Sequence, residues 1–353
     1  MFKIGRLHAG DADPARLLDD PANFLHSIDV DQDLAVFFRT STDLLRSASF
    51  ADGRNAIALS QLQQTSLSAI MAIKDRTPIA DRFLFNCSFC GSTLLARLLD
   101  VPGRSLVIKE PRCLTDLAAW KIFNSRDGKP LDRLRPSLEL ARVALRRRFR
   151  PGEKVTVKVA SQGNILLDTL AEEPARLRPV FITISRASFL QAIFRGGADR
   201  MQYAAKIAWH MATGVPDGDA LLKEAVKAGA DPLRKAANLA ILARYLQVGT
   251  FQRAALLGGW NDDQVIDFDA IVRSPHDAAT KAAKALDLDI SANDIDRNVA
   301  RLAGKYAKQP DMAYDANGRT AADRRLQADH RHVFNDALAW ADRVLGPQRV
   351  VNG

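Results

Sequence analysis

Short apolar runs alternate with helical patterns through most of the chain. Five of these runs have the length and composition of buried strands, at residues 82–86, 105–109, 155–159, 179–184 and 264–268. Strands of a parallel sheet show such continuous apolar runs because helices cover both faces of the sheet. The pattern therefore predicts an α/β fold, namely a three-layer sandwich around a mostly parallel sheet of about five strands.

Helical periodicity fills much of the remaining chain. A long block at about 198–255 indicates a helical insertion, and further helices are expected at 276–286, where Ser274 and Pro275 suit a helix start, and at 320–345. Residues 31–50 and 55–73 also carry apolar positions near helical spacing. We therefore expect residues 1–80 to form a helical N-terminal extension packed on an α/β domain formed by residues 81–353.

Charge and cysteine content narrow the class of partner. The 353-residue chain has 50 Lys and Arg against 41 Asp and Glu, a net charge of +9, which favours anionic partners. Its three cysteines are too few for a disulfide scaffold and suit reduced thiols in the cytoplasm. We expect no membrane span, because the longest uncharged stretch is rich in Gln, Ser and Thr. The start also lacks the apolar core of a secretory signal.

Nucleic acid is not an expected partner. The only features in its favour are the net charge and the arginine-rich run at 146–150, and no recognised nucleic-acid-binding motif accompanies them. We interpret this run as a solvated helix end, where cations suit the helix dipole. Nothing in the sequence fixes the oligomeric state.

The segment 86–93 lies between the first predicted strand and a helix. Such a loop directs backbone N–H groups toward one point, and the helix dipole adds partial positive charge there. Gly91 allows close approach of an anion to the backbone. The sequence predicts a phosphate- or sulfate-binding loop formed by Ser88, Phe89, Cys90, Gly91, Ser92 and Thr93.

This loop is not a Walker A sequence. Aligned on Gly91, the lysine of that motif falls on Ser92 and its first glycine on Asn86. The γ-phosphate and magnesium chemistry of an NTPase then loses its main electrostatic support. A P-loop kinase or NTPase stays as one alternative, a catalytically inactive nucleotide-binding protein as another, and an ordinary strand-to-helix turn as a third. Cys87 and Cys90 have a CxxC spacing without a second pair, which favours packing over zinc or redox chemistry.

Two separated motifs give the chain a family resemblance. Gly91-Ser92-Thr93-Leu94-Leu95, followed by Lys109-Glu110-Pro111, resembles the sulfotransferase superfamily. The segments 265–275 and 286–288 resemble the late strand, turn and helix of that family, and the order of motifs fits from about residue 82 to 345. The resemblance implies a fold like that of P-loop nucleoside triphosphate hydrolases. It also implies 3′-phosphoadenosine 5′-phosphosulfate as donor, no metal, and transfer of a sulfuryl group to a hydroxyl or amine of a small-molecule or glycan-like acceptor.

The resemblance and the predicted strand ends suggest catalytic residues. Glu110 follows the second strand, and because strand carboxyl ends line the crevice of open α/β sheets, it is our candidate general base. A capping or salt-bridged glutamate is the alternative. Many family members carry Lys or Arg two residues before the loop glycine, where this chain has Phe89. Sulfuryl transfer builds charge on the bridging oxygen, so another cation should serve there, with Lys109 and Lys158 as candidates.

Two further residues match nucleotide-binding positions of the family. Arg186 follows the fourth strand where family members bind the 3′-phosphate, although the serine expected eight residues later is Phe194. A surface arginine at a helix start is the alternative. Lys308 lies in a polar loop before the last helix, near the place where relatives fold a basic loop over the nucleotide. The usual glycine-rich form of that loop is absent, so a solvated loop is the alternative.

Overall fold

We describe a computed structural model of the chain. It describes residues 13–53, 62–73, 79–227, 231–306, 309–313 and 316–350. Lys308, predicted to lie near the nucleotide, is therefore outside the described residues.

A five-stranded parallel sheet forms the centre of the fold. Its strands are β4 (Asp81–Asn86), β5 (Ser105–Lys109), β6 (Lys154–Lys158), β7 (Leu177–Thr183) and β8 (Val265–Asp267), in the spatial order β5-β6-β4-β7-β8. All residues of β4 and β5 are buried, as the continuous apolar runs predict. The α/β class and the five-stranded parallel sheet are confirmed.

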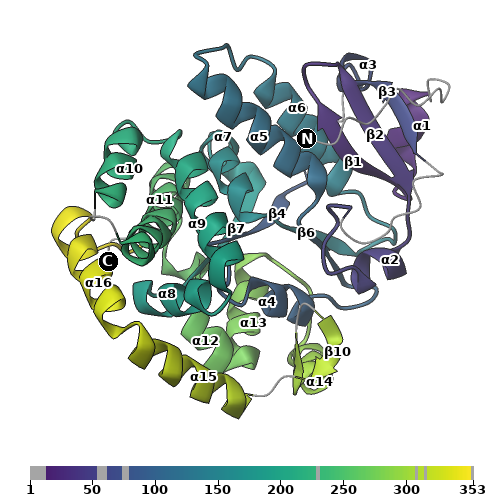
Figure 1. The fold of residues 1–353 in the computed structure, drawn as a ribbon. Coiled ribbons are helices and arrows are strands. Elements are labelled where there is room, and N and C mark those ends of the chain that lie inside the picture. Colours follow the sequence, from purple (N-terminus) through teal and green to yellow (C-terminus); the bar gives the residue numbers. More distant parts are fainter. Residues whose placement is uncertain are drawn as a thin grey trace.

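Helices pack on both sides of this sheet, with α7, α9 and α11 on one side and α4, α12 and α13 on the other (Figure 1). The ring of Phe251 on α11 lies 5.2 Å from that of Phe181 on β7 and joins the two layers. The helices along the α/β part are α4 (Ser92–Leu98), α5 (Arg112–Arg126), α6 (Leu134–Leu145), η2 (Ser161–Leu166), α7 (Leu167–Leu170), η3 (Pro174–Arg176), α8 (Arg186–Phe194), α9 (Gly197–Ala212), α10 (Gly218–Val226), α11 (Pro232–Gly258), η4 (Asp262–Gln264), α12 (Phe268–Arg273), α13 (Pro275–Ala285), α14 (Ala292–Leu302), α15 (Ala316–Asp329) and α16 (Arg331–Val344). A short hairpin, β9 (Lys305–Tyr306) with β10 (Gln309–Ala313), precedes α15.

The expected helical blocks are present but more divided than predicted. The insertion at 198–255 comprises α9, α10 and α11. Helix α11 begins after Asp231, whose side chain accepts a hydrogen bond from Leu233 N, and ends at Gly259 in the left-handed conformation. Helix α13 begins at Pro275 as expected, although the Ser274 side chain does not cap it. No helix in the described part of the chain is both long and apolar enough to cross a bilayer.

The N-terminal region is not the helical extension that the periodicity predicted. Its described residues, 13–53, 62–73 and 79–80, contain β1 (Asn23–Asp29), β2 (Leu34–Arg39) and β3 (Gln63–Ser66) in an antiparallel sheet of order β1-β2-β3, together with the short helices α1 (Pro14–Asp19), α2 (Thr42–Ser47) and α3 (Leu67–Met71). The run from Ala35 to Phe38 is buried at every position. A short run buried on all sides fits strand and helix equally well, so spacing alone could not decide between them. The division of the chain at residue 80 stays a prediction.

The arginine-rich run also differs from expectation, because its first two residues are not solvated. Arg146 is 6% exposed. Arg147 donates hydrogen bonds to the carbonyls of Leu17 (2.8 Å) and Leu18 (2.6 Å), so it fastens α1 to the end of α6. Burial lowers the pKa of Arg147 to about 10. These contacts give the start of the run a structural role.

A buried histidine predicts acid sensitivity. His210 on α9 is 6% exposed, and burial followed by the positive charges of Lys206 and Arg126 lowers its pKa to about 4. In the unfolded chain the imidazole of His210 has its ordinary pKa of 6.5 and binds a proton below that pH. The neutral, buried side chain of His210 therefore makes its full contribution to stability above pH 6.5, and this contribution is lost as the pH falls toward 4. We expect this residue to reduce the free energy of unfolding by about 2 kcal/mol between pH 7 and 5. Urea unfolding of wild type and His210→Leu at both pH values tests this, and an unchanged pH dependence in the variant would contradict it.

Candidate active site

The loop between β4 and α4 has an unusual backbone. Ser88, Phe89 and Gly91 all lie in the left-handed region, with φ of 63°, 50° and 73°. Glycine adopts this conformation freely, whereas each non-glycine residue costs about 1–3 kcal/mol and persists only where its surroundings hold it. Loops of this kind can form concave anion sites from successive backbone N–H groups. The surroundings of the predicted loop therefore hold its backbone in a costly conformation.

Buried amides hold the loop in this shape. Asn86 is 2% exposed, and its side chain donates to Val159 O (2.7 Å) and accepts from Ser88 N (3.1 Å). Asn164 on η2 donates to Asn86 O (2.9 Å) and to Gln247 Oε1 on α11 (3.0 Å). Because these partners lie on different segments, the loop is fixed by the residue that follows β6, by η2 and by α11 together.

The second sequence motif lies against this loop. A Cβ added at Gly91 would lie 3.4 Å from Phe268 and 3.4 Å from Ile271, both on α12. The two segments on which the family resemblance rests therefore meet in space. Ser92 and Thr93, at the start of α4, are 5% and 6% exposed. Their hydroxyls are thus packed within the loop rather than extended into solvent.

The direction of the strand connections changes at the same position. The connection from β4 leads to β5 on one side of the sheet, whereas that from β7 leads to β8 on the other. Open α/β sheets bind ligands at the carboxyl ends of strands where the connections diverge in this way. The β4 loop and Arg186, the first residue after the β7 turn, both lie at this switch point.

Glu110 and Lys158 form an ion pair at the same edge of the sheet. Glu110 follows β5 with φ of 55°, and its N–H donates to Lys158 O at 2.7 Å. The ammonium of Lys158 donates to Glu110 Oε1, and the two side chains are 2% and 17% exposed, respectively. The charge of Lys158 also opposes the rise that burial causes in the pKa of Cys90, which places this ammonium near the loop. The pair brings a proton acceptor and a cation to the loop.

Lys109 points to a different environment. Its ammonium donates to Leu45 O (3.0 Å), Arg46 O (3.3 Å) and Val107 O (3.2 Å), and it is 2% exposed. Burial lowers its pKa to about 8. These bonds hold α2 against β5 and give Lys109 a structural role. Of the two candidate lysines, Lys158 is the one that contacts Glu110.

Arg186 lies at the correct edge of the sheet but is held by the C-terminal segment. Its guanidinium donates to Asp342 Oδ1 (2.8 Å) and to Gly346 O. Arg244 lies nearby, 8% exposed, and donates to Ile184 O. Burial, with a contribution from the charge of Arg186, lowers the pKa of Arg244. Two arginines therefore lie close together at the carboxyl end of β7.

Two side chains of α9 that the sequence did not single out contact the loop. The guanidinium carbon of Arg200 lies 4.6 Å from the centroid of the Phe89 ring. Tyr203 meets the same ring edge-on at 5.8 Å, and its hydroxyl lies 3.4 Å from Ser88 Oγ. The helical pattern of 198–255 gave no signal for this contact, because spacing does not show which surface a polar helix face meets.

Cys87 and Cys90 are free and completely buried. Burial raises the pKa of both thiols, which keeps them protonated and unreactive. The packing interpretation of the CxxC spacing agrees with this environment.

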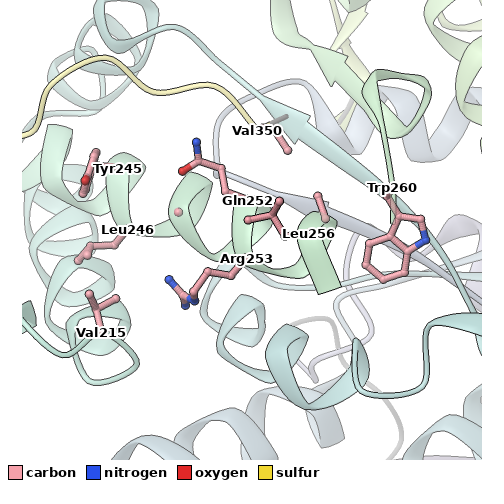
Figure 2. Close-up of a pocket in the computed structure, with 10 residues that line it drawn as sticks. Val215, Tyr245, Leu246, Gln252, Arg253, Leu256, Trp260 and Val350 are labelled. Atoms are coloured by element: carbon pink, nitrogen blue, oxygen red, sulfur yellow. The ribbon is translucent and has the colours of Figure 1, made fainter. Parts of the chain in front are cut away.

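A cavity of about 410 Å³ lies elsewhere, along α11 near the C-terminal segment (Figure 2). Tyr245, Gln252, Arg253 and Trp260 line it together with Val350. No residue predicted for the anion loop or for catalysis is among those that line this cavity.

Comparisons of the chain with protein-family models, curated proteins and solved structures found no match. The residues of the site therefore carry the functional inference by themselves.

Proposed function

We propose that this protein is a sulfotransferase-like enzyme that uses 3′-phosphoadenosine 5′-phosphosulfate as donor. The observation that carries the proposal is the Glu110–Lys158 pair beside a left-handed loop at the carboxyl edge of a parallel sheet. This arrangement joins an anion-binding backbone to a proton acceptor, as transfer of an anionic group to a hydroxyl or amine requires.

In this proposal the loop binds the donor. The backbone N–H groups of residues 90–93 hold the phosphosulfate at the start of α4, where the first N–H groups have no partner within the helix. Arg186 and its neighbour Arg244 lie at the end of β7, where an arginine fork suits the 3′-phosphate. The acceptor would enter beside Glu110.

The reaction then balances as a single displacement. The acceptor oxygen or nitrogen attacks sulfur, and the bond from sulfur to the bridging oxygen breaks. Glu110 accepts the acceptor's proton, and the nucleotide leaves as adenosine 3′,5′-bisphosphate. Lys158 donates a hydrogen bond to Glu110 Oε1 and so fixes the direction of the carboxylate for this task.

Turnover can be tested without knowing the natural acceptor. Purified protein is mixed with p-nitrophenyl sulfate and adenosine 3′,5′-bisphosphate, and release of p-nitrophenol is followed. We expect release that requires the bisphosphate and is not supported by ATP. Hydrolysis of ATP with magnesium, without release from the sulfate ester, would instead favour the kinase or NTPase alternative.

Replacing Arg186 should weaken nucleotide binding. We expect Arg186→Ala to raise the Kd for adenosine 3′,5′-bisphosphate about tenfold, because it removes a charge-assisted contact to the 3′-phosphate. The ion pair with Asp342 opens at little cost, since that carboxylate is 77% exposed. Arg178→Ala, at the opposite end of β7, is the matched control. Equal Kd values for Arg186→Ala and wild type in a calorimetric titration would remove Arg186 from the site.

A further inference from the structure

The side chain of Arg200 extends from α9 to the predicted anion-binding loop at residues 88–93. Its guanidinium carbon lies 4.6 Å from the centroid of the Phe89 ring, a cation–π distance, and its Nη1 donates to Ala192 O at 2.6 Å. Phe89 also packs against Phe189, with ring centroids 6.5 Å apart. The guanidinium is therefore held between the end of α8 and the ring that projects from the loop.

Gly196 makes this position possible. A Cβ at residue 196 would lie 2.0 Å from Cδ and 2.3 Å from Cγ of Arg200, so any other residue would displace the stem of the arginine. The clash involves the middle of the side chain rather than its mobile end. The absence of a Cβ at the turn between α8 and α9 thus leaves the space in which the Arg200 side chain extends toward the loop.

The two lysines near the loop have other partners. Lys158 contacts Glu110, and Lys109 donates to backbone carbonyls around α2. Charge that develops on the bridging oxygen as the sulfur–oxygen bond breaks still requires a cation, and the position two residues before Gly91 supplies only an aromatic ring. Arg200 brings a permanent positive charge to that ring.

We propose that Arg200 is the cation that contacts the 5′-phosphosulfate at the bridging oxygen, with Phe89 as the platform that aims it. This inference rests on the proposed function. It assigns to α9 a catalytic charge that would otherwise come from the loop itself. Tyr203 then acts as a positioning residue, because it packs on Phe89 and its hydroxyl lies beside Ser88.

The charge at the 5′ position can be measured by binding alone. Adenosine 3′,5′-bisphosphate carries the full negative charge that the leaving nucleotide develops, so it reports on the cation directly. We expect Arg200→Gln to raise its Kd about ten- to a hundredfold, the range of a lost hydrogen bond to a charged group. Adenosine 3′-monophosphate, which lacks the 5′-phosphate, should bind both forms equally. Lys206→Gln, a change of equal charge at an exposed position on α9, is the control.

A compensating substitution tests the position of the charge. Adding Phe89→Lys to Arg200→Gln returns a cation to the loop and should restore most of the lost affinity. Gly196→Ala, which keeps Arg200 but displaces it, should reproduce the loss, whereas Gly214→Ala, where an added Cβ has ordinary contacts, should not.

The outcomes separate this inference from the proposed function. If wild type does not bind the bisphosphate, the proposed function fails and the role of Arg200 fails with it. If wild type binds and both Arg200→Gln and Gly196→Ala bind equally well, Arg200 has no role at the 5′ position, while the proposed function stands. Should Arg200→Gln not fold, the Kd of Gly196→Ala decides.

Discussion

Glu110→Gln is expected to reduce the rate of sulfuryl transfer by about 100- to 10,000-fold, the usual contribution of a positioned general base. The amide has the same shape and can still accept the hydrogen bond from Lys158, but it cannot take the proton of the acceptor. Binding of adenosine 3′,5′-bisphosphate should be unchanged, because the proposed site puts the acceptor, and not the nucleotide, beside the glutamate. The loss should therefore appear in kcat with little change in the Kd of the nucleotide.

A matched control is available on α10. Glu224 pairs with Lys227 at 2.8 Å, so Glu224→Gln makes the same chemical change in an ion pair remote from the loop. We expect this variant to transfer the sulfuryl group from 3′-phosphoadenosine 5′-phosphosulfate to an alcohol acceptor at the wild-type rate. Wild-type transfer to that acceptor by Glu110→Gln would show that another group accepts the proton, and a loss limited to nucleotide affinity would place Glu110 in the binding site instead.

The largest effect on stability is expected at Asp81, the first residue of β4. Its carboxylate accepts from Arg142 Nε at 2.7 Å and lies 3.6 Å from Arg146, and Asp81 and Arg142 are 3% and 6% exposed, respectively. Asp81→Ala would remove this carboxylate and leave the guanidinium of Arg142 buried without it. Breaking such a pair costs about 3–5 kcal/mol.

Urea unfolding measures this cost. Asp20→Ala removes the carboxylate of an exposed pair with Arg39, so it serves as the control and should change stability by less than about 1 kcal/mol. A double variant that also replaces Arg142 with Met should recover much of the loss, because the buried guanidinium is then removed together with its carboxylate. If Asp81→Ala changed the free energy of unfolding as little as Asp20→Ala does, the buried ion pair at the start of β4 would not have the expected effect on stability.

The sequence predicted the central sheet well because its strands are buried on both faces. Runs such as 82–86 have a continuous apolar centre, here Phe83 to Phe85, and are followed by loop residues, which leaves few other interpretations. The same property caused the error near the N-terminus. The run at 34–38 is also apolar throughout, and the nearby Leu44 and Leu45 extended it into an apparent helical spacing, although β2 ends at Arg39 and α2 is a separate short helix.

The candidate site was predictable only where it follows strand ends. Glu110 and Arg186 were found because parallel strands bring their carboxyl ends to one edge. The choice between Lys109 and Lys158 depends on which ammonium faces Glu110, and strand position alone does not give that direction. Arg200 depends on a helix corner with Gly196 and on the side that α9 turns to the loop, which are properties of long-range packing.

The proposed donor site is tested most directly by calorimetric titration of the wild-type protein with adenosine 3′,5′-bisphosphate, in parallel with ATP and magnesium. We predict saturable binding of the bisphosphate that is clearly tighter than binding of ATP with magnesium. Absence of bisphosphate binding, or tighter binding of ATP with magnesium, would contradict the assignment of the β4 loop to a phosphosulfate nucleotide.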